Sequence, residues 1–312
     1  MKRWGSIAYL NVNKTVDYSF RGLVVKLEEV KKFICNEFIY GHHWCSLNAS
    51  AIVFSMMLLL GMAIRWEFLF IVYFGTQCIY NYNHYRELDV DAATPSPRVA
   101  HLHKYGTMYP SLIKLYGVLF FLLLFLYGNI ASILFGSFLL SLGLIYTSNV
   151  KSMSKHIIGF KSLYTSISWG LLILFTMIYF SSPLTMAMFL FFLFVFLRMM
   201  IITTFYDIKD LQSDQEAGLL TLPMVFKHKS GWLNILHVLN VLSFTPVIVG
   251  VIFDILPLYS LFLLLILLYG FVYIQKAKGD TADINFLSYV IADGEYNIWP
   301  ILLLLGAFIP FG

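Results

Sequence analysis

The sequence predicts an all-α protein that crosses a membrane several times. Of its 312 residues, 59% are hydrophobic and only 12% are charged, whereas soluble domains carry about 25% charged residues. The mean hydropathy is +0.77. The apolar residues form segments near the ~20 residues that an α-helix needs to cross ~30 Å of hydrocarbon. The expected class is therefore an all-α polytopic membrane protein.

Residues 1–44 precede the apolar segments and are predicted to form a cytoplasmic N-terminal segment. They hold seven of the 21 Lys and Arg residues, and they lack the apolar run and cleavage site of a signal peptide. Apolar residues recur there at helical spacing at Leu23, Leu27, Val30, Ile34 and Phe38. This amphipathic helix could lie in the membrane interface or pack on the protein's own cytoplasmic surface. Both alternatives remain open.

The second predicted unit, residues 45–312, contains nine apolar segments that we expect to cross the membrane. The ninth is short and has Pro300 near its start, so residues 284–295 could supply part of that helix. The nine segments are expected at 45–64, 66–85, 109–128, 130–149, 158–181, 183–206, 232–253, 256–275 and 296–312.

The basic residues predict how the chain is oriented. The N-terminal tail and the connections after segments two, four, six and eight hold 18 of the 21 Lys and Arg residues, when Lys161 is counted with the connection that precedes it. Since basic loops stay on the cytoplasmic side, the N-terminus is predicted to be cytoplasmic and the C-terminus outside. In a prokaryote this would be the cell membrane. Basic residues spread over short loops do not form a nucleic-acid surface, so no nucleic-acid partner is expected.

The stretch 207–223 is the most unusual feature of the sequence. Asp207, Asp210 and Asp214 follow an apolar segment at positions i, i+3 and i+7, which share one helical face. Such carboxylates repel one another, and they lie at the C-terminal end of a helix, where the macrodipole favours cations. A positive group is therefore expected to compensate them.

A second polar cluster ends the second apolar segment. Asn83, Glu87 and Asp91 share one helical face at i, i+4 and i+8, and this segment runs in the same direction as the sixth. Both clusters should thus emerge at one membrane level and face each other. Oxygen ligands of this kind suit Mg²⁺ shared with a substrate diphosphate, although such acids could also merely end two helices at a solvated boundary.

These two clusters define the predicted site. The metal ligands are Asn83, Glu87, Asp91, Asp207, Asp210 and Asp214, of which Asp91, Asp210 and Asp214 are the predicted catalytic residues. The cations expected to neutralise a diphosphate are Arg98, Lys151, Lys155, Lys161 and Lys209; Asn83 is expected to bind it as well. Lys151 and Lys155 could instead serve only as cytoplasmic anchors.

The spacing of both clusters resembles a known family. The first reads Asn83-xxx-Glu87-xxx-Asp91-x₆-Arg98, and the second reads Tyr206-Asp207-Ile-Lys209-Asp210-xxx-Asp214-xxx-Gly218-xx-Thr221-Leu-Pro223. Together they resemble the paired motifs of the UbiA superfamily of intramembrane prenyltransferases. The second motif is specific and the first degenerate, because His84, Glu87 and Val99 replace the usual Asp, Asp and Pro.

The resemblance implies a fold and a reaction. The fold is about nine transmembrane helices around a central cavity, and residues 45–312 would form the prenyltransferase domain. The reaction is transfer of a prenyl group from a polyprenyl diphosphate, entering from membrane lipid, to an aromatic or lipid-like acceptor, with Mg²⁺ as cofactor. The resemblance also places Tyr146, Lys151 and Lys161 around the diphosphate and makes Asn48 a candidate for the acceptor pocket.

Two other functions fit parts of the sequence. A terpene cyclase of the same family would capture the allylic cation internally. An ion-coupled transporter would use intramembrane acids, but here the acids lie at one boundary level. Arg198 lies within the sixth segment and should face the bundle, either to pair with an acidic cluster or to extend to the interface. The three cysteines form no metal or disulfide pattern and are expected to be apolar filler.

Overall fold

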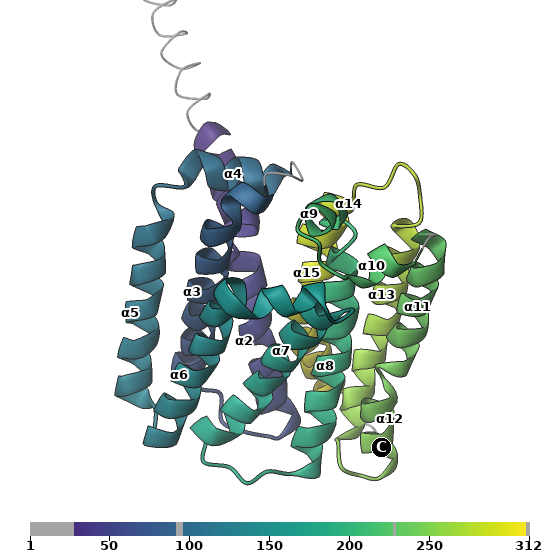
Figure 1. Cartoon of the computed structure of the whole chain (residues 1–312). Coiled ribbons are helices and arrows are strands. Elements are labelled where there is room, and N and C mark those ends of the chain that lie inside the picture. The colour runs from purple at the N-terminus through teal and green to yellow at the C-terminus, as the bar shows by residue number, and fades with distance from the viewer. Residues whose placement is uncertain (1–27, 92–95, 227–228, 310–312) are drawn as a thin grey trace, which may run out of the picture.

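The structure is a computed structural model that describes residues 28–91, 96–226 and 229–309. Helices and the turns between them make up this part of the chain, and it contains no strand (Figure 1). The predicted all-α class is confirmed.

The helices follow the predicted apolar segments closely. The first six segments correspond to α2 (His43–Leu59), α3 (Trp66–Asp91), α5 (Tyr109–Tyr127), α6 (Ile130–Ile145), α7 (Phe160–Tyr179) and α8 (Met186–Tyr206). The last three correspond to α11 (Lys229–Leu242) with α12 (Thr245–Ile252), η3 (Leu258–Leu264) with α13 (Leu265–Lys276), and α15 (Asp293–Phe308). Between them lie α4 (Pro97–Tyr105), η1 (Tyr146–Val150), η2 (Lys151–Lys155), α9 (Leu211–Glu216), α10 (Leu222–Val225), α14 (Ile284–Phe286) and η4 (Leu287–Ala292).

Five helical stretches of the described chain are long and apolar enough to cross a membrane. They are Tyr109–Tyr127, Phe160–Tyr179, Met186–Tyr206, Gly231–Ile252 and Leu258–Lys276. The apolar helices α2 and α6 are shorter. The chain is therefore an integral membrane protein, and nine crossings stay a prediction.

Two boundaries differ from the expected ones. The helix α3 continues to Asp91, six residues past its expected end, so the whole first cluster is carried on a helix. Residues 284–295 do supply the beginning of the last helix, because α14 and the π-helical η4 lead directly into α15. The apolar segment alone missed this extension, since Asp293 and Glu295 interrupt its hydropathy.

Short turns join the helices into hairpins at one end of the bundle. Only Gly128 and Asn129 separate α5 from α6. The Asn129 side chain accepts a bond from the Ser132 backbone N–H at 2.7 Å, which caps α6, and it donates to Ile178 O at 3.0 Å. The longer connections with α4, α9 and α14 lie together at the opposite end (Figure 1).

Aromatic and aliphatic side chains fill the centre of the bundle. The fully buried residues Phe191, Phe194, Trp299 and Met56 belong to one core contributed mainly by α2, α3, α7, α8 and α15. Within lipid, close packing rather than water exclusion holds helices together. Helices α3 and α6 approach each other closely at Gly143, because a Cβ atom added to this glycine would lie 2.5 Å from the Ile79 side chain.

The N-terminal helix, described from residue 28 to residue 40, makes contacts on one face and is exposed on the other. The Phe33 ring packs edge-on against Tyr105 of α4, and Glu37 Oε2 lies 2.7 Å from His101 Nε2. Val30, Ile34 and Phe38 are exposed. The contacts with α4 are those expected of a helix that packs on the protein's own cytoplasmic surface. The exposed apolar stripe is that expected of a helix in the membrane interface. Both alternatives therefore stay predictions.

Candidate active site

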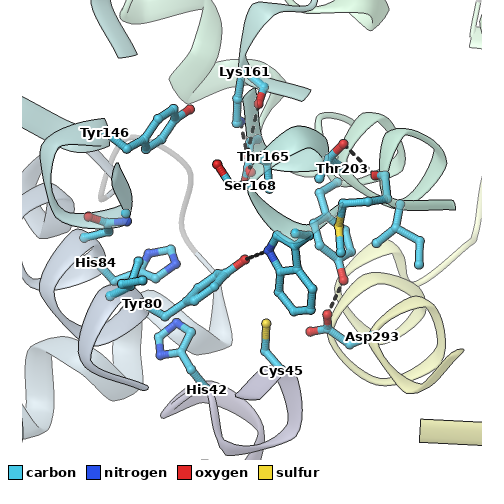
Figure 2. A pocket seen from close by; sticks show the side chains of 18 of the residues that line it. His42, Cys45, Tyr80, His84, Tyr146, Lys161, Thr165, Ser168, Thr203 and Asp293 are labelled. Carbon is cyan, nitrogen blue, oxygen red and sulfur yellow. Dashed lines mark hydrogen bonds and ion pairs between the residues drawn. The ribbon is translucent and has the colours of Figure 1, made fainter. Parts of the chain in front are cut away.

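One cavity of about 250 Å³ collects most of the predicted site residues. It runs between α2, α3, α7, α8, α9 and α15, at the end of the bundle that carries the long connections. One part of its wall is charged, and the other is aromatic and apolar. Figure 2 shows some of the side chains that line it, with Lys161 and Asp293 on different sides of the space. The predicted residues that line it are Asn48, Asn83, Glu87, Arg98, Tyr146, Lys151, Lys161, Lys209, Asp210 and Asp214.

The second cluster surrounds a lysine. Lys161 Nζ lies 3.1 Å from Asp207 Oδ1, 3.7 Å from Asp210 Oδ2 and 3.2 Å from Asp214 Oδ2. Asp207 is fully buried and Asp214 nearly so. The positive group that the three carboxylates require is thus supplied, in this structure, by an ammonium group near the start of α7.

A tight turn brings Lys161 to the aspartates. Gly218 has φ +69°, a conformation that favours glycine, and it ends α9 with its N–H bonded to Gln215 O at 3.1 Å. The chain then pairs with the α6–α7 connection, where Leu220 N–H donates to Ser154 O at 2.7 Å and accepts at its carbonyl from Gly159 N at 2.9 Å. The Gly218 position of the motif therefore forms the turn after which Leu220 pairs with the α6–α7 connection.

The electrostatic surroundings of the three carboxylates differ. Burial raises the pKa of Asp207 to about 6, and Lys161 offsets only part of this effect. Burial also raises the pKa of Asp214, again opposed by Lys161. Burial disfavours ionisation of Asp210 too, but Lys209, Lys161 and Arg98 together hold its pKa below the usual value. Of the three carboxylates, Asp210 is therefore the one whose ionised form its surroundings favour most.

The first cluster faces the same cavity from α3. Lys151 Nζ forms an ion pair with Glu87 Oε1 at 2.7 Å, which connects α3 to η2. Asn83 Oδ1 is buried and has no hydrogen-bond partner among the described residues, and the same holds for the Tyr146 hydroxyl. Such unpartnered polar atoms beside a cavity are free to bind a polar ligand.

An aromatic ring lies between two of the cations. The Arg98 guanidinium carbon is 4.7 Å from the centre of the Tyr289 ring, and Lys209 Nζ is 5.2 Å from the same centre. Lys209 Nζ also lies 2.7 Å from Asp210 Oδ1. Tyr289 thus contacts cations from both sequence motifs at one wall of the cavity, although neither motif includes it.

The rest of the wall is aromatic with a few polar atoms. Trp169 Nε1 donates to the Tyr80 hydroxyl at 3.2 Å, and the rings of Trp169 and Tyr296 are 6.0 Å apart. Asn48 also lines the cavity. It is buried, and its Oδ1 has no hydrogen-bond partner among the described residues. His42 and Cys45 lie in the same region, below Tyr80 in the view of Figure 2.

Some predicted residues lie elsewhere. Asp91 ends α3, but its side chain lies outside the part of the chain that the structure describes. Asp207 does not line the cavity itself, but it forms an ion pair with Lys161, which does. Lys155 is exposed and does not line the cavity. His84 does line it, with its ring stacked on His42 at 4.5 Å.

Arg198 faces the bundle as expected, but both destinations expected for its charge are wrong. It neither pairs with a predicted cluster nor reaches the interface: Arg198 Nε donates to Glu295 Oε1 at 2.7 Å, and both side chains are fully buried. Cys35 is also exposed rather than apolar filler, while Cys45 and Cys78 are buried; all three are free thiols. The residues that the sequence did not single out are His42, Cys45, Tyr80, Tyr289, Asp293 and Glu295, which carry no motif.

The donor atoms around Lys161 fit a divalent cation in their chemistry. All of them are carboxylate oxygens, which Mg²⁺ prefers, and they already surround a positive charge. Within the described residues no three acidic, His or Cys side chains are arranged at metal-ligand distances. Asp207, Asp210 and Asp214 therefore stay the predicted Mg²⁺ ligands of the second cluster, as do Asn83, Glu87 and Asp91 of the first.

The sequence model of the UbiA prenyltransferase family matches residues 47–292. The chain belongs to this family. The matched residues include both stretches whose spacing resembles the paired motifs of the family. A search of the curated proteins found no match for this UbiA chain.

Solved structures show that the fold is also that of the family. A UbiA homologue from Aeropyrum pernix K1 superposes with a TM-score of 0.64 at 16% identity, covering 85% of this chain and 97% of its own. A UbiA homologue from Archaeoglobus fulgidus, bound to GPP and Mg²⁺, gives 0.62 at 13% identity, covering 88% and 99%. A structure described as digeranylgeranylglyceryl phosphate synthase gives 0.52 at 15% identity, with the same coverage.

Proposed function

We propose that this protein transfers a prenyl group from a polyprenyl diphosphate to an aromatic or lipid-like acceptor within the membrane. The observation that carries the proposal is the arrangement of three aspartates around one cation at the charged end of an aromatic cavity. UbiA homologues of the same fold bind GPP or DMAPP with Mg²⁺, which supports this choice of substrate and cofactor.

The charged end is suited to a diphosphate. When bound, Mg²⁺ would neutralise charge that develops on the diphosphate as the C–O bond breaks. Arg98, Lys151, Lys161 and Lys209 supply fixed positive charge beside the aspartates, and the Asn83 amide and the Tyr146 hydroxyl offer further polar contacts. Preorganised groups of this kind stabilise a leaving group without reorganisation.

The aromatic end is suited to the prenyl chain. The rings of Tyr80, Trp169 and Tyr296 form an apolar wall next to the charged end, and their faces can stabilise an allylic cation. Asn48, whose Oδ1 is unpartnered among the described residues, would contact the acceptor. The prenyl substrate would enter laterally from the bilayer, since its prenyl chain is lipid-soluble.

An assay with labelled prenyl diphosphates in membranes tests the proposal. We expect product formation that stops when EDTA removes divalent cations. Asp214→Ala removes a carboxylate that lies beside Lys161, and we expect its rate to fall by at least ~10²-fold. The matched control is Glu216→Ala, because Glu216 lies on the same helix but is exposed and outside the cavity.

Three results would contradict parts of this function. Full turnover in both Asp214→Ala and Asp91→Ala would exclude the predicted clusters from the reaction. Hydrocarbon product formed without an acceptor would identify a terpene cyclase of the same family. Ion-dependent uptake into proteoliposomes that requires Asp207 or Asp210, with no turnover of diphosphate, would indicate a transporter.

A further inference from the structure

Asp293 is a carboxylate of the cavity that belongs to neither predicted cluster. It begins α15 and lines the same cavity as Asp210 and Asp214. The hydroxyl of Tyr206 donates a short hydrogen bond to its Oδ1. Since Tyr206 directly precedes Asp207, this bond places Asp293 next to the charged end without making it part of the aspartate group around Lys161.

The charge of Asp293 is compensated differently from that of the other cavity carboxylates. Glu87 forms an ion pair with Lys151, Asp210 with Lys209, and Asp214 with Lys161. For Asp293 the described residues provide the neutral Tyr206 hydroxyl and no ion pair, and the charges of Arg98 and Lys209 act on it from beyond ion-pair distance. A carboxylate that no cation contacts directly accepts a proton more readily than one that is ion-paired.

The second oxygen of Asp293 is available to a ligand. Figure 2 shows Oδ1 taken by the tyrosine hydroxyl, while the other oxygen points toward the space that Cys45 and Tyr80 also border. This space adjoins the aromatic wall of Trp169 and Tyr296. An acceptor bound there would have its reactive atom between the diphosphate end and Asp293.

We propose that Asp293 is the catalytic base that removes the proton from the acceptor, an inference that rests on the proposed prenyl transfer. The C1–O bond of the prenyl diphosphate breaks, and its electron pair leaves on the diphosphate. A new bond forms between C1 and the nucleophilic oxygen or ring carbon of the acceptor. The proton that this atom carries moves to the free oxygen of Asp293, and the hydrogen bond from Tyr206 keeps the carboxylate oriented.

The substitution Asp293→Asn separates this role from a structural one. Asparagine has nearly the same shape and its amide oxygen can still accept the bond from Tyr206, but it cannot take up a proton. Ionisation of the diphosphate needs no acceptor and so should survive. It is measured with geranyl diphosphate carrying ¹⁸O at the bridging position, as movement of the label to non-bridging oxygens. Transfer is measured with the same diphosphate and, separately, 4-hydroxybenzoate or diacylglycerol.

We expect Asp293→Asn to scramble the label within about 3-fold of the wild type and to transfer at least ~10²-fold more slowly, the usual contribution of a general base. We expect Asp293→Glu to recover part of the transfer. If Asp293→Asn does not fold, as judged by thermal unfolding in detergent, Asp293→Ser takes its place in both assays.

Transfer by Asp293→Asn within about 3-fold of the wild type would overturn the inference. A folded variant that loses scrambling as well as transfer would also overturn it, because Asp293 would then act on the diphosphate. A wild-type protein that neither scrambles the label nor transfers would overturn the proposed function itself, and this inference with it.

Discussion

At the scale of single residues, the charge of Lys161 determines the state of the site. Its ammonium lies within 4 Å of three carboxylates that are otherwise crowded at the end of a helix. A divalent cation bound to these oxygens would compete with it for them. Lys161 is thus the counter-charge of these carboxylates, and in the proposed reaction it would also lie beside the diphosphate.

Lys161→Met tests this balance. Removing one partner of a buried ion pair costs about 3–5 kcal/mol because a charge is left uncompensated, so we expect lower thermal stability in EDTA. Mg²⁺ should then raise the unfolding temperature more in the variant than in the wild type, because cation binding to the folded state stabilises it. The matched control is Lys155→Met, since Lys155 is exposed and outside the cavity. An equal or smaller effect of Mg²⁺ in Lys161→Met would contradict the prediction.

At the scale of helices, a buried polar network connects four elements. Arg198 of α8 bonds to Glu295 of α15 and to Asn240 of α11, and the Tyr273 hydroxyl of α13 lies 3.4 Å from Glu295. Asn240 also donates to Leu267 O at 2.9 Å. A charge inside the bundle is tolerated only with such partners. The network therefore fixes the first turn of α15, which carries Asp293.

Arg198→Met should destabilise the protein by about 3–5 kcal/mol, because Glu295 keeps its charge without a partner. The double variant Arg198→Met/Glu295→Gln removes both charges. The amide oxygen of the new glutamine side chain can still accept the hydrogen bond from the Tyr273 hydroxyl. We expect it to regain most of the lost stability in thermal unfolding in detergent. If the double variant is as unstable as the single one, the loss comes from packing and not from the unpaired charge.

At the scale of the whole molecule, the orientation predicted from the basic loops can be measured. Cys35 is exposed on the N-terminal helix, whereas Cys45 and Cys78 are buried. The wild-type chain therefore carries a single reporter thiol on the side predicted to be cytoplasmic. We expect a membrane-impermeant maleimide to label inside-out vesicles and to leave sealed right-side-out vesicles unlabelled.

Cys35→Ser is the control for this measurement, because it should abolish the labelling while the buried cysteines stay unreactive. Labelling of sealed right-side-out vesicles would reverse the predicted orientation. It would also place both carboxylate clusters on the outer face of the membrane.

The sequence by itself determined the helical membrane fold, the limits of most helices and the two polar clusters. These follow from hydropathy and from helical spacing, which are properties of neighbouring residues. Spacing put Asp207, Asp210 and Asp214 on one face and demanded a cation for them. It could not name Lys161 as that cation from charge alone, because several lysines lie at the same boundary.

Only the tertiary structure decided which distant residues meet. Arg198 and Glu295 are 97 positions apart and Tyr206 and Asp293 are 87 apart, and no local pattern links them. Hydropathy even obscured Asp293, because a charged residue lowers the apparent length of an apolar helix. Such partners become visible only when packing brings α8 and α15 together, since burial makes the pairing of each charge necessary.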